Sequence, residues 1–208
     1  MVKVKICGIT NLEDALSAVS FGADALGFNF VEGTPRYIDP DEVYEIIREL
    51  PPLVIRVGVF RNDFLGRIRQ ISNFCRLDML QFHGDETPEY LRQFSNLRVI
   101  KAIRVKNEKS LEKMKDYDQD TFLIDTFDSD IPGGTGRLID ISLASIAIKS
   151  NNRIILSGGL TPDNIIDVLK KVQPYAVDVC SGVESTTKGK KDYSKLKIFI
   201  DNVRKVEL

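Results

Sequence analysis

The sequence of 208 residues predicts an α/β fold, a single (β/α)8 barrel of the TIM type that spans residues 1–208. Short runs of β-branched and apolar residues alternate with amphipathic helical patterns eight times along the chain. Roughly 200 residues is the lower size limit for eight such units in a closed parallel barrel. No linker rich in Pro or Ser and no break in composition divides the chain, so we expect one domain.

The first unit illustrates the pattern. Apolar residues in Val2–Cys7 alternate with two lysines and a terminal cysteine, and a period of two is typical of a β-strand. Gly8 then allows the chain to turn, and Asn11 can cap the helix expected at Leu12–Phe21.

The following units repeat this order of strand and helix, which parallel strands need for their connections. Further strands are expected at Ala25–Phe30, Val54–Phe60, Met79–Phe82, Val99–Ile103, Thr121–Asp125, Arg153–Leu156 and Ala176–Val179. Further helices are expected at Pro40–Leu50, Asp63–Phe74, Pro88–Phe94, Glu108–Lys115, Ile139–Ser150, Pro162–Val172 and Tyr193–Val206.

A doubly wound open sheet is the alternative fold. It normally has a Gly-x-Gly-x-x-Gly turn after its first strand, and Cys7-Gly8-Ile9-Thr10 does not supply one. The longest connection, Thr126–Leu138, contains three glycines and is interpreted as a loop over a site. A plain surface loop is the alternative interpretation of this segment.

Composition excludes several classes of function. The formal net charge is −1, so no basic field favours binding to nucleic acid or to an anionic membrane. Charges interrupt every apolar run, and the N-terminus has no signal pattern, so no membrane span is expected. The three cysteines are far apart in sequence and indicate a reducing compartment, most simply the cytoplasm.

Polar residues lie opposite the apolar side of several expected strands. If the apolar side faces the helices, these residues point into the barrel. They are Lys5, Cys7, Arg56, Gln81, His83, Lys101, Asp125 and Asp178. Unpaired buried charge is costly, so the pattern predicts a paired polar interior, a substrate site at the C-terminal ends of the strands, or both.

Cys7, His83 and Asp125 stand at or just after the ends of strands one, four and six, where a barrel of this type places its site. A thiol there is a candidate catalytic group, and a small buried hydrophobe is the alternative. His83 is the only histidine, which excludes a metal centre built from several histidines. It is either a packed, hydrogen-bonded residue or a titrating one.

Two glycine turns follow strands seven and eight, where barrels commonly bind phosphate. Gly158 and Gly159 form the first turn, and Ser181 and Gly182 belong to the second. Glycines let backbone N–H groups approach an anion, although such turns can also be purely structural. Arg36, in the loop after strand two, has a planar fork that suits a carboxylate or a phosphate, unless it is a solvated charge.

Several motifs, in this order and over nearly the whole chain, resemble those of the phosphoribosylanthranilate isomerases. They are Lys5-Ile6-Cys7-Gly8-Ile9-Thr10, Pro35-Arg36-Tyr37, Gln81-Phe82-His83-Gly84, Leu123-Ile124-Asp125-Thr126, Leu156-Ser157-Gly158-Gly159-Leu160, Val177-Asp178-Val179-Cys180-Ser181-Gly182-Val183-Glu184 and Lys190-Lys191-Asp192. Departures include Leu138 and Ile141, where the family usually has aromatic residues, and Cys180, where serine is frequent.

The resemblance implies an Amadori rearrangement of N-(5-phosphoribosyl)anthranilate, an enzymatic step of tryptophan biosynthesis, with Cys7 as general base and Asp125 as general acid. Their environments must then shift the two pKa values in opposite senses. It also implies a phosphorylated sugar substrate, no metal or organic cofactor, and a monomer or homodimer. The implied substrate-binding residues are Arg36, Gln81, His83, Gly158, Gly159, Asp178, Ser181 and Gly182.

Two other functions stay open from sequence. One is the sister sugar isomerase of histidine biosynthesis, or a form that accepts both substrates; that enzyme uses aspartate for both acid and base, so Cys7 argues against it. The other is a barrel that binds a phosphorylated sugar without turnover.

Overall fold

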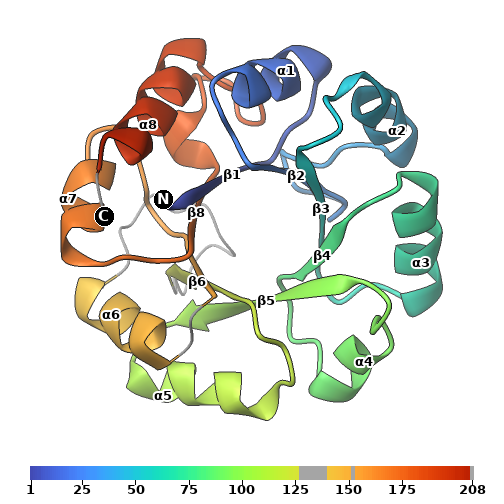
Figure 1. Cartoon of the computed structure of the whole chain (residues 1–208). Helices are drawn as coiled ribbons and strands as arrows, with labels where there is room; N and C mark the ends of the chain where they lie inside the picture. Colours follow the sequence, from blue (N-terminus) through green and yellow to red (C-terminus); the bar gives the residue numbers. More distant parts are fainter. Residues whose placement is uncertain (127–139, 151–152, 207–208) are drawn as a thin grey trace.

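The computed structural model describes residues 1–126, 140–150 and 153–206. In these residues eight parallel strands form a closed barrel in chain order, and the last strand pairs with the first. Helices surround the barrel on the outside (Figure 1). The predicted (β/α)8 fold is therefore confirmed.

The strands are β1 (Lys3–Cys7), β2 (Ala25–Asn29), β3 (Ile55–Phe60), β4 (Met79–Phe82), β5 (Arg98–Val105), β6 (Phe122–Thr126), β7 (Ile154–Leu156) and β8 (Ala176–Val179). The α-helices are α1 (Leu12–Ser20), α2 (Pro40–Glu49), α3 (Leu65–Phe74), α4 (Pro88–Arg92), α5 (Glu108–Glu112), α6 (Ile141–Ser150), α7 (Ile165–Lys171) and α8 (Tyr193–Lys205). Two short 3-10 helices are η1 (Lys113–Asp116) and η2 (Ser181–Val183). Every predicted element is found, with its ends shifted by a few residues.

Apolar side chains form two separate layers. The larger layer lies between the strands and the helices and includes Val4 and Ile6 of β1. The smaller one fills the barrel interior and consists of Val57, Ile100, Ala102, Leu123, Ile155 and Ala176. Successive side chains of a strand point alternately into the two layers. The inner layer fills only part of the barrel interior, and inward side chains nearer the C-terminal ends of the strands line a cavity and can be polar.

The prediction that Arg56 and Lys101 point into the barrel is wrong. Val57 on β3 and Ile100 on β5 occupy the interior, so their neighbours in sequence face outward. Arg56 Nε donates to Asp78 Oδ2 at 2.7 Å, and Lys101 Nζ lies 2.8 Å from Glu86 Oε2. Strands β3 and β5 carry apolar residues on both faces. In such strands, hydrophobicity alone does not tell which face points toward the helices.

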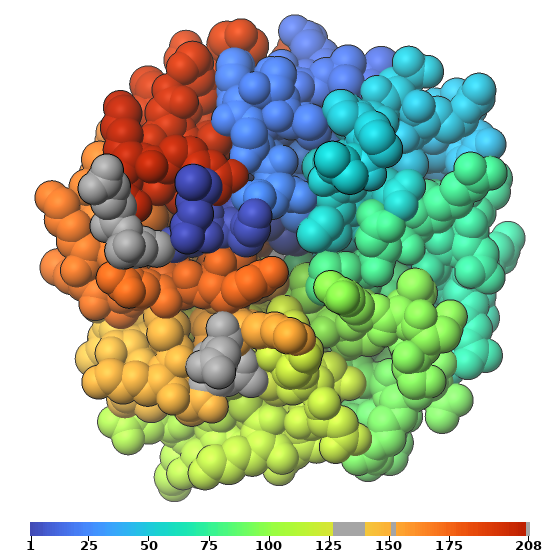
Figure 2. All heavy atoms as spheres, in the orientation of Figure 1, coloured from blue at the N-terminus to red at the C-terminus, as the bar shows by residue number. Residues whose placement is uncertain are grey.

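The face that carries the N-terminus is visible in Figure 2, in which the first residues lie beside the last turns of α8. The predicted cap of α1 is present, because the Asn11 side chain accepts a hydrogen bond from the Asp14 N–H. Most of the predicted loop Thr126–Leu138 lies outside the described residues. Of the helices that the structure describes, none is both long and apolar enough to span a membrane.

Candidate active site

A cavity of about 450 Å³ opens at the C-terminal ends of the strands. All ten residues predicted to form the site line it, although they come from segments far apart in sequence. They are Cys7, Arg36, Gln81, His83, Asp125, Gly158, Gly159, Asp178, Ser181 and Gly182. The closed parallel barrel brings them together because it places all eight strand ends on one face.

Cys7, at the end of β1, lies beside a buried ion pair. Lys5 Nζ is 2.6 Å from Asp178 Oδ1, and both side chains are almost fully buried. Burial by itself would lower the pKa of Lys5, but the charges and hydrogen bonds of Asp178 and Cys7 together outweigh it and raise that pKa above its ordinary value. Lys5 therefore stays positively charged next to the Cys7 sulfur, although its partner Asp178 offsets part of that charge.

The Cys7 thiol has a pKa lowered to about 6. The largest cause is a hydrogen bond from the Cys180 thiol, and the positive charges of Lys5 and, to a smaller extent, Lys191 add to it. Burial and the negative charge of Asp178 act in the opposite direction. The same hydrogen bond, together with burial, raises the pKa of Cys180. Of the two neighbouring thiols, Cys7 is the one that ionises.

Asp125 lines the cavity at the end of β6 and contacts His83 beyond the end of β4. His83 Nε2 lies 3.4 Å from Asp125 Oδ2, and Gln81 Nε2 lies 3.1 Å from His83 Nδ1. The other carboxylate oxygen of Asp125 accepts a hydrogen bond from the Thr126 N–H at 2.8 Å. In this arrangement Gln81 donates to the imidazole, which orients its other nitrogen toward Asp125.

The amide oxygen of Gln81 is buried and has no hydrogen-bond partner among the residues that the structure describes. Gln81 itself lines the cavity. A buried acceptor without a partner is unfavourable, and a hydroxyl or N–H group of a ligand would satisfy it.

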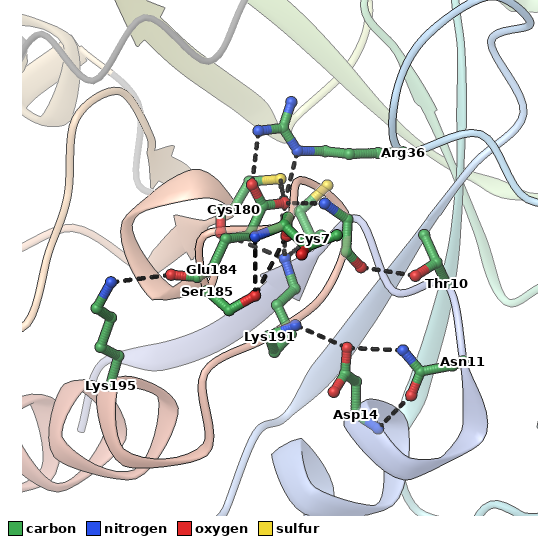
Figure 3. A network of polar contacts seen from close by, with 12 residues as sticks. Cys7, Thr10, Asn11, Asp14, Arg36, Cys180, Glu184, Ser185, Lys191 and Lys195 are labelled. Atoms are coloured by element: carbon green, nitrogen blue, oxygen red, sulfur yellow. Dashed lines mark hydrogen bonds and ion pairs between the residues drawn. The ribbon is translucent and has the colours of Figure 1, made fainter.

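Arg36 is held by a carboxylate that the sequence analysis did not assign. Its Nε donates to Glu184 Oε1 at 2.7 Å and its Nη2 to Glu184 Oε2 at 2.9 Å, as Figure 3 shows. This bidentate pair joins the loop after β2 to the segment after β8. It leaves Nη1 of Arg36 as the nitrogen not bonded to Glu184.

The glycine turns after β7 and β8 are required by local geometry. Gly158 and Gly159 have φ values of +93° and +64°, in the left-handed region that favours glycine. A Cβ on Gly182 would lie 1.9 Å from the carbonyl oxygen of Leu160. The two turns are therefore packed against each other, and this brings their backbones together at one side of the cavity.

Sequence reasoning missed two arginines that line the cavity, Arg61 after β3 and Arg104 near the end of β5. Arg104 follows Ile100 and Ala102 with the strand period of two, so the correct inward face of β5 would have identified it. Arg61 was missed for the same reason, because Arg56 instead of Val57 was assigned to the inward face of β3.

The barrel and its polar cavity define a (β/α)8 enzyme with its site at the C-terminal ends of the strands. The family model described as N-(5'phosphoribosyl)anthranilate (PRA) isomerase matches residues 4–202. The chain belongs to this family.

Individual relatives agree with the family match. An N-(5'-phosphoribosyl)anthranilate isomerase of Pelobacter propionicus is 50% identical over 200 residues, which are 96% of this chain and 94% of the relative. A dimeric phosphoribosylanthranilate isomerase from Thermotoga maritima, solved in the form of monomers, has a TM-score of 0.88 and 40% identity, covering 99% of this chain and 100% of that one. A further phosphoribosyl anthranilate isomerase has a TM-score of 0.87, 41% identity and the same coverage. It was solved with reduced 1-(o-carboxyphenylamino)-1-deoxyribulose 5-phosphate.

Proposed function

We propose that this chain rearranges N-(5-phosphoribosyl)anthranilate to 1-(o-carboxyphenylamino)-1-deoxyribulose 5-phosphate, with Cys7 as general base and Asp125 as general acid. The observation that carries these roles is that a thiol with a lowered pKa and a carboxyl group line one cavity from strands that are not neighbours. A proton donor and a proton acceptor are thereby available to one bound sugar.

In the proposed sequence, Asp125 first donates a proton to the furanose ring oxygen, and the ring opens to a Schiff base. The Cys7 thiolate then removes the proton from C2′, which gives an enolamine that relaxes to the ketone. The lowered pKa of Cys7 fits the role of base, which must be unprotonated at the start. The proton that Asp125 must hold stays a prediction.

Substrate binding is proposed at two ends of the cavity. Backbone N–H groups of the turns at Gly158, Gly159, Ser181 and Gly182 would bind the phosphate. Nη1 of Arg36, which is not bonded to Glu184, would bind the anthranilate carboxylate. The reduced product analogue solved with a relative carries both of these groups, which supports this division. Gln81, His83 and Asp178 would contact the sugar between them. The dimeric relative supports a monomer or a homodimer as the assembly.

The rate is expected to fall at acid pH with the protonation of Cys7. Because the pKa of this thiol is lowered to about 6, about nine tenths of it is thiolate at pH 7 and about one tenth at pH 5. A plot of log kcat/KM against pH should therefore bend downward below about pH 6, since kcat/KM reports the free enzyme. An acidic limb placed near pH 8.5, the ordinary value for a thiol, would contradict the assignment of the base.

Growth of two deficient hosts tests the function itself. The chain is expected to restore tryptophan-independent growth to a host that lacks this isomerase, and to leave a host lacking the histidine-pathway sugar isomerase dependent on histidine. Rescue of both hosts would support the dual-substrate alternative. Rescue of neither by a well-expressed, folded chain would support a barrel that only binds its ligand.

A further inference from the structure

The motif Lys190-Lys191-Asp192 has no part in the mechanism above, yet the structure buries its central lysine. The side chain of Lys191 is 1% exposed. Its Nζ donates to the backbone oxygen of Cys7 at 2.6 Å and to that of Cys180 at 3.2 Å, and lies 3.6 Å from Glu184 Oε1. Figure 3 shows the ammonium between these groups. A buried charge placed so specifically requires an explanation.

Lys191 joins the first strand of the barrel to the last. Ile6 and Val179 are register partners in β1 and β8, so Cys7 and Cys180 follow them at the seam between the strands. Lys191 bridges the carbonyl groups of both cysteines. Its own backbone N–H donates to Asp14 Oδ2 at 2.8 Å, so α1 holds the segment from the other side, while the ammonium points toward Cys7 (Figure 3).

The charges around Cys7 leave one cation without a carboxylate of its own. Lys5 is paired with Asp178, and Arg36 is paired bidentately with Glu184. Lys191 shares Glu184 only at 3.6 Å, a longer contact than either of those pairs. These five described groups carry one positive charge in excess, and a thiolate at Cys7 would neutralise it. The carboxylate of Asp14 binds the backbone N–H of Lys191 and the side chain of Asn11, and no ion pair joins it to the ammonium.

We propose that Lys191 is a positioning residue for the proposed reaction: its buried ammonium fixes the ends of β1 and β8 and adds a positive charge that stabilises the Cys7 thiolate. The hydrogen bonds to two carbonyl groups set where the base lies. The charge favours the ionisation of Cys7, in addition to the larger effects of the Cys180 hydrogen bond and the Lys5 charge. A lysine with a purely structural role would form the hydrogen bonds to the two carbonyl groups without affecting the ionisation of Cys7.

The test separates charge from hydrogen bonding in the full chain. Lys191→Gln keeps N–H donors near the carbonyls but removes the charge, Lys191→Arg keeps the charge, and Lys190→Gln removes an exposed charge one residue away as the matched control. The rate at which iodoacetamide alkylates Cys7 is measured against pH by peptide mass spectrometry. This readout follows thiolate content and does not depend on isomerase activity.

Lys191→Gln is expected to raise the apparent pKa of Cys7 by about one unit, which slows its alkylation about fivefold at pH 6. Lys191→Arg and Lys190→Gln are expected to titrate like the wild type. The acidic limb of kcat/KM should shift to higher pH in Lys191→Gln as well. If Cys7 in the Lys191→Gln variant is alkylated with the same pH dependence as in the wild type, the proposal is overturned, whatever the isomerase activity of the variant.

A second variant covers the case in which Lys191→Gln does not fold. Glu184→Gln removes a carboxylate from the same cluster and adds to the positive excess, so it should lower the apparent pKa of Cys7. An unchanged or raised value would refute the premise that excess positive charge in this cluster, to which Lys191 belongs, stabilises the Cys7 thiolate. Absence of isomerase activity in the wild type would instead contradict the proposed function and leave the alkylation result standing.

Discussion

Cys7→Ser is expected to lower kcat by a factor of about 100 or more while the fold stays intact, because loss of a general base costs at least this much. The serine hydroxyl is close to the thiol in size but stays protonated in the range in which the thiol, with its pKa near 6, is ionised. The neighbouring charges of Lys5 and Lys191 would then have no thiolate to stabilise.

Cys75→Ser serves as the matched control for this variant. Cys75 is buried outside the barrel, where burial raises the pKa of its thiol to about 12, and it does not line the cavity. Its kcat should stay at the wild-type value. Single-turnover kinetics with substrate deuterated at C2′ should show a large isotope effect in Cys7→Ser. A kcat within a fewfold of wild type in that variant would exclude Cys7 as the base.

Asp125→Asn is expected to lower kcat by a similar factor of about 100 or more, for the opposite reason. The amide preserves the shape of the side chain but has no acidic proton to give to the ring oxygen. His83 Nε2 lies 3.4 Å from Asp125 Oδ2, so the substitution also replaces the carboxylate beside the imidazole with a neutral amide. The loss should appear in kcat and in kcat/KM alike.

Asp78→Asn is the control for the carboxylate. Asp78 pairs with Arg56 on the outer side of β3 and lies away from the cavity, so its loss affects stability alone. Ring opening precedes proton removal in the proposed sequence, and the isotope effect at C2′ should therefore be small in Asp125→Asn. A large isotope effect there, or turnover at the wild-type rate, would assign the acid to another group.

The fold and the gathering of these residues around one cavity were predictable for one physical reason. Motifs at the ends of parallel strands meet at one face once the barrel closes, so sequence position along each strand was enough to group Cys7, His83 and Asp125. The direction of side chains was predictable only where one face of a strand is polar. It failed for Arg56 and Lys101, whose strands are apolar on both faces.

Contacts within the segment after β8 could not be predicted. Arg36 and Glu184 are 148 residues apart, and Lys191 follows the last strand in a stretch without helical or strand periodicity. Nothing in such a stretch indicates which partner each side chain contacts. The burial of the Lys191 ammonium between two backbone carbonyls became visible only in three dimensions.

The pairing of β1 with β8 has a consequence for the newborn chain. Cys7 leaves the ribosome well before Lys191, which follows it by 184 residues, and before Cys180, which lowers its pKa. Throughout most of translation this sulfur is an ordinary thiol. If Cys7 is the base, as proposed, its ionised form depends on the closure of the barrel by β8, and a polypeptide that ends before this strand is expected to have no isomerase activity.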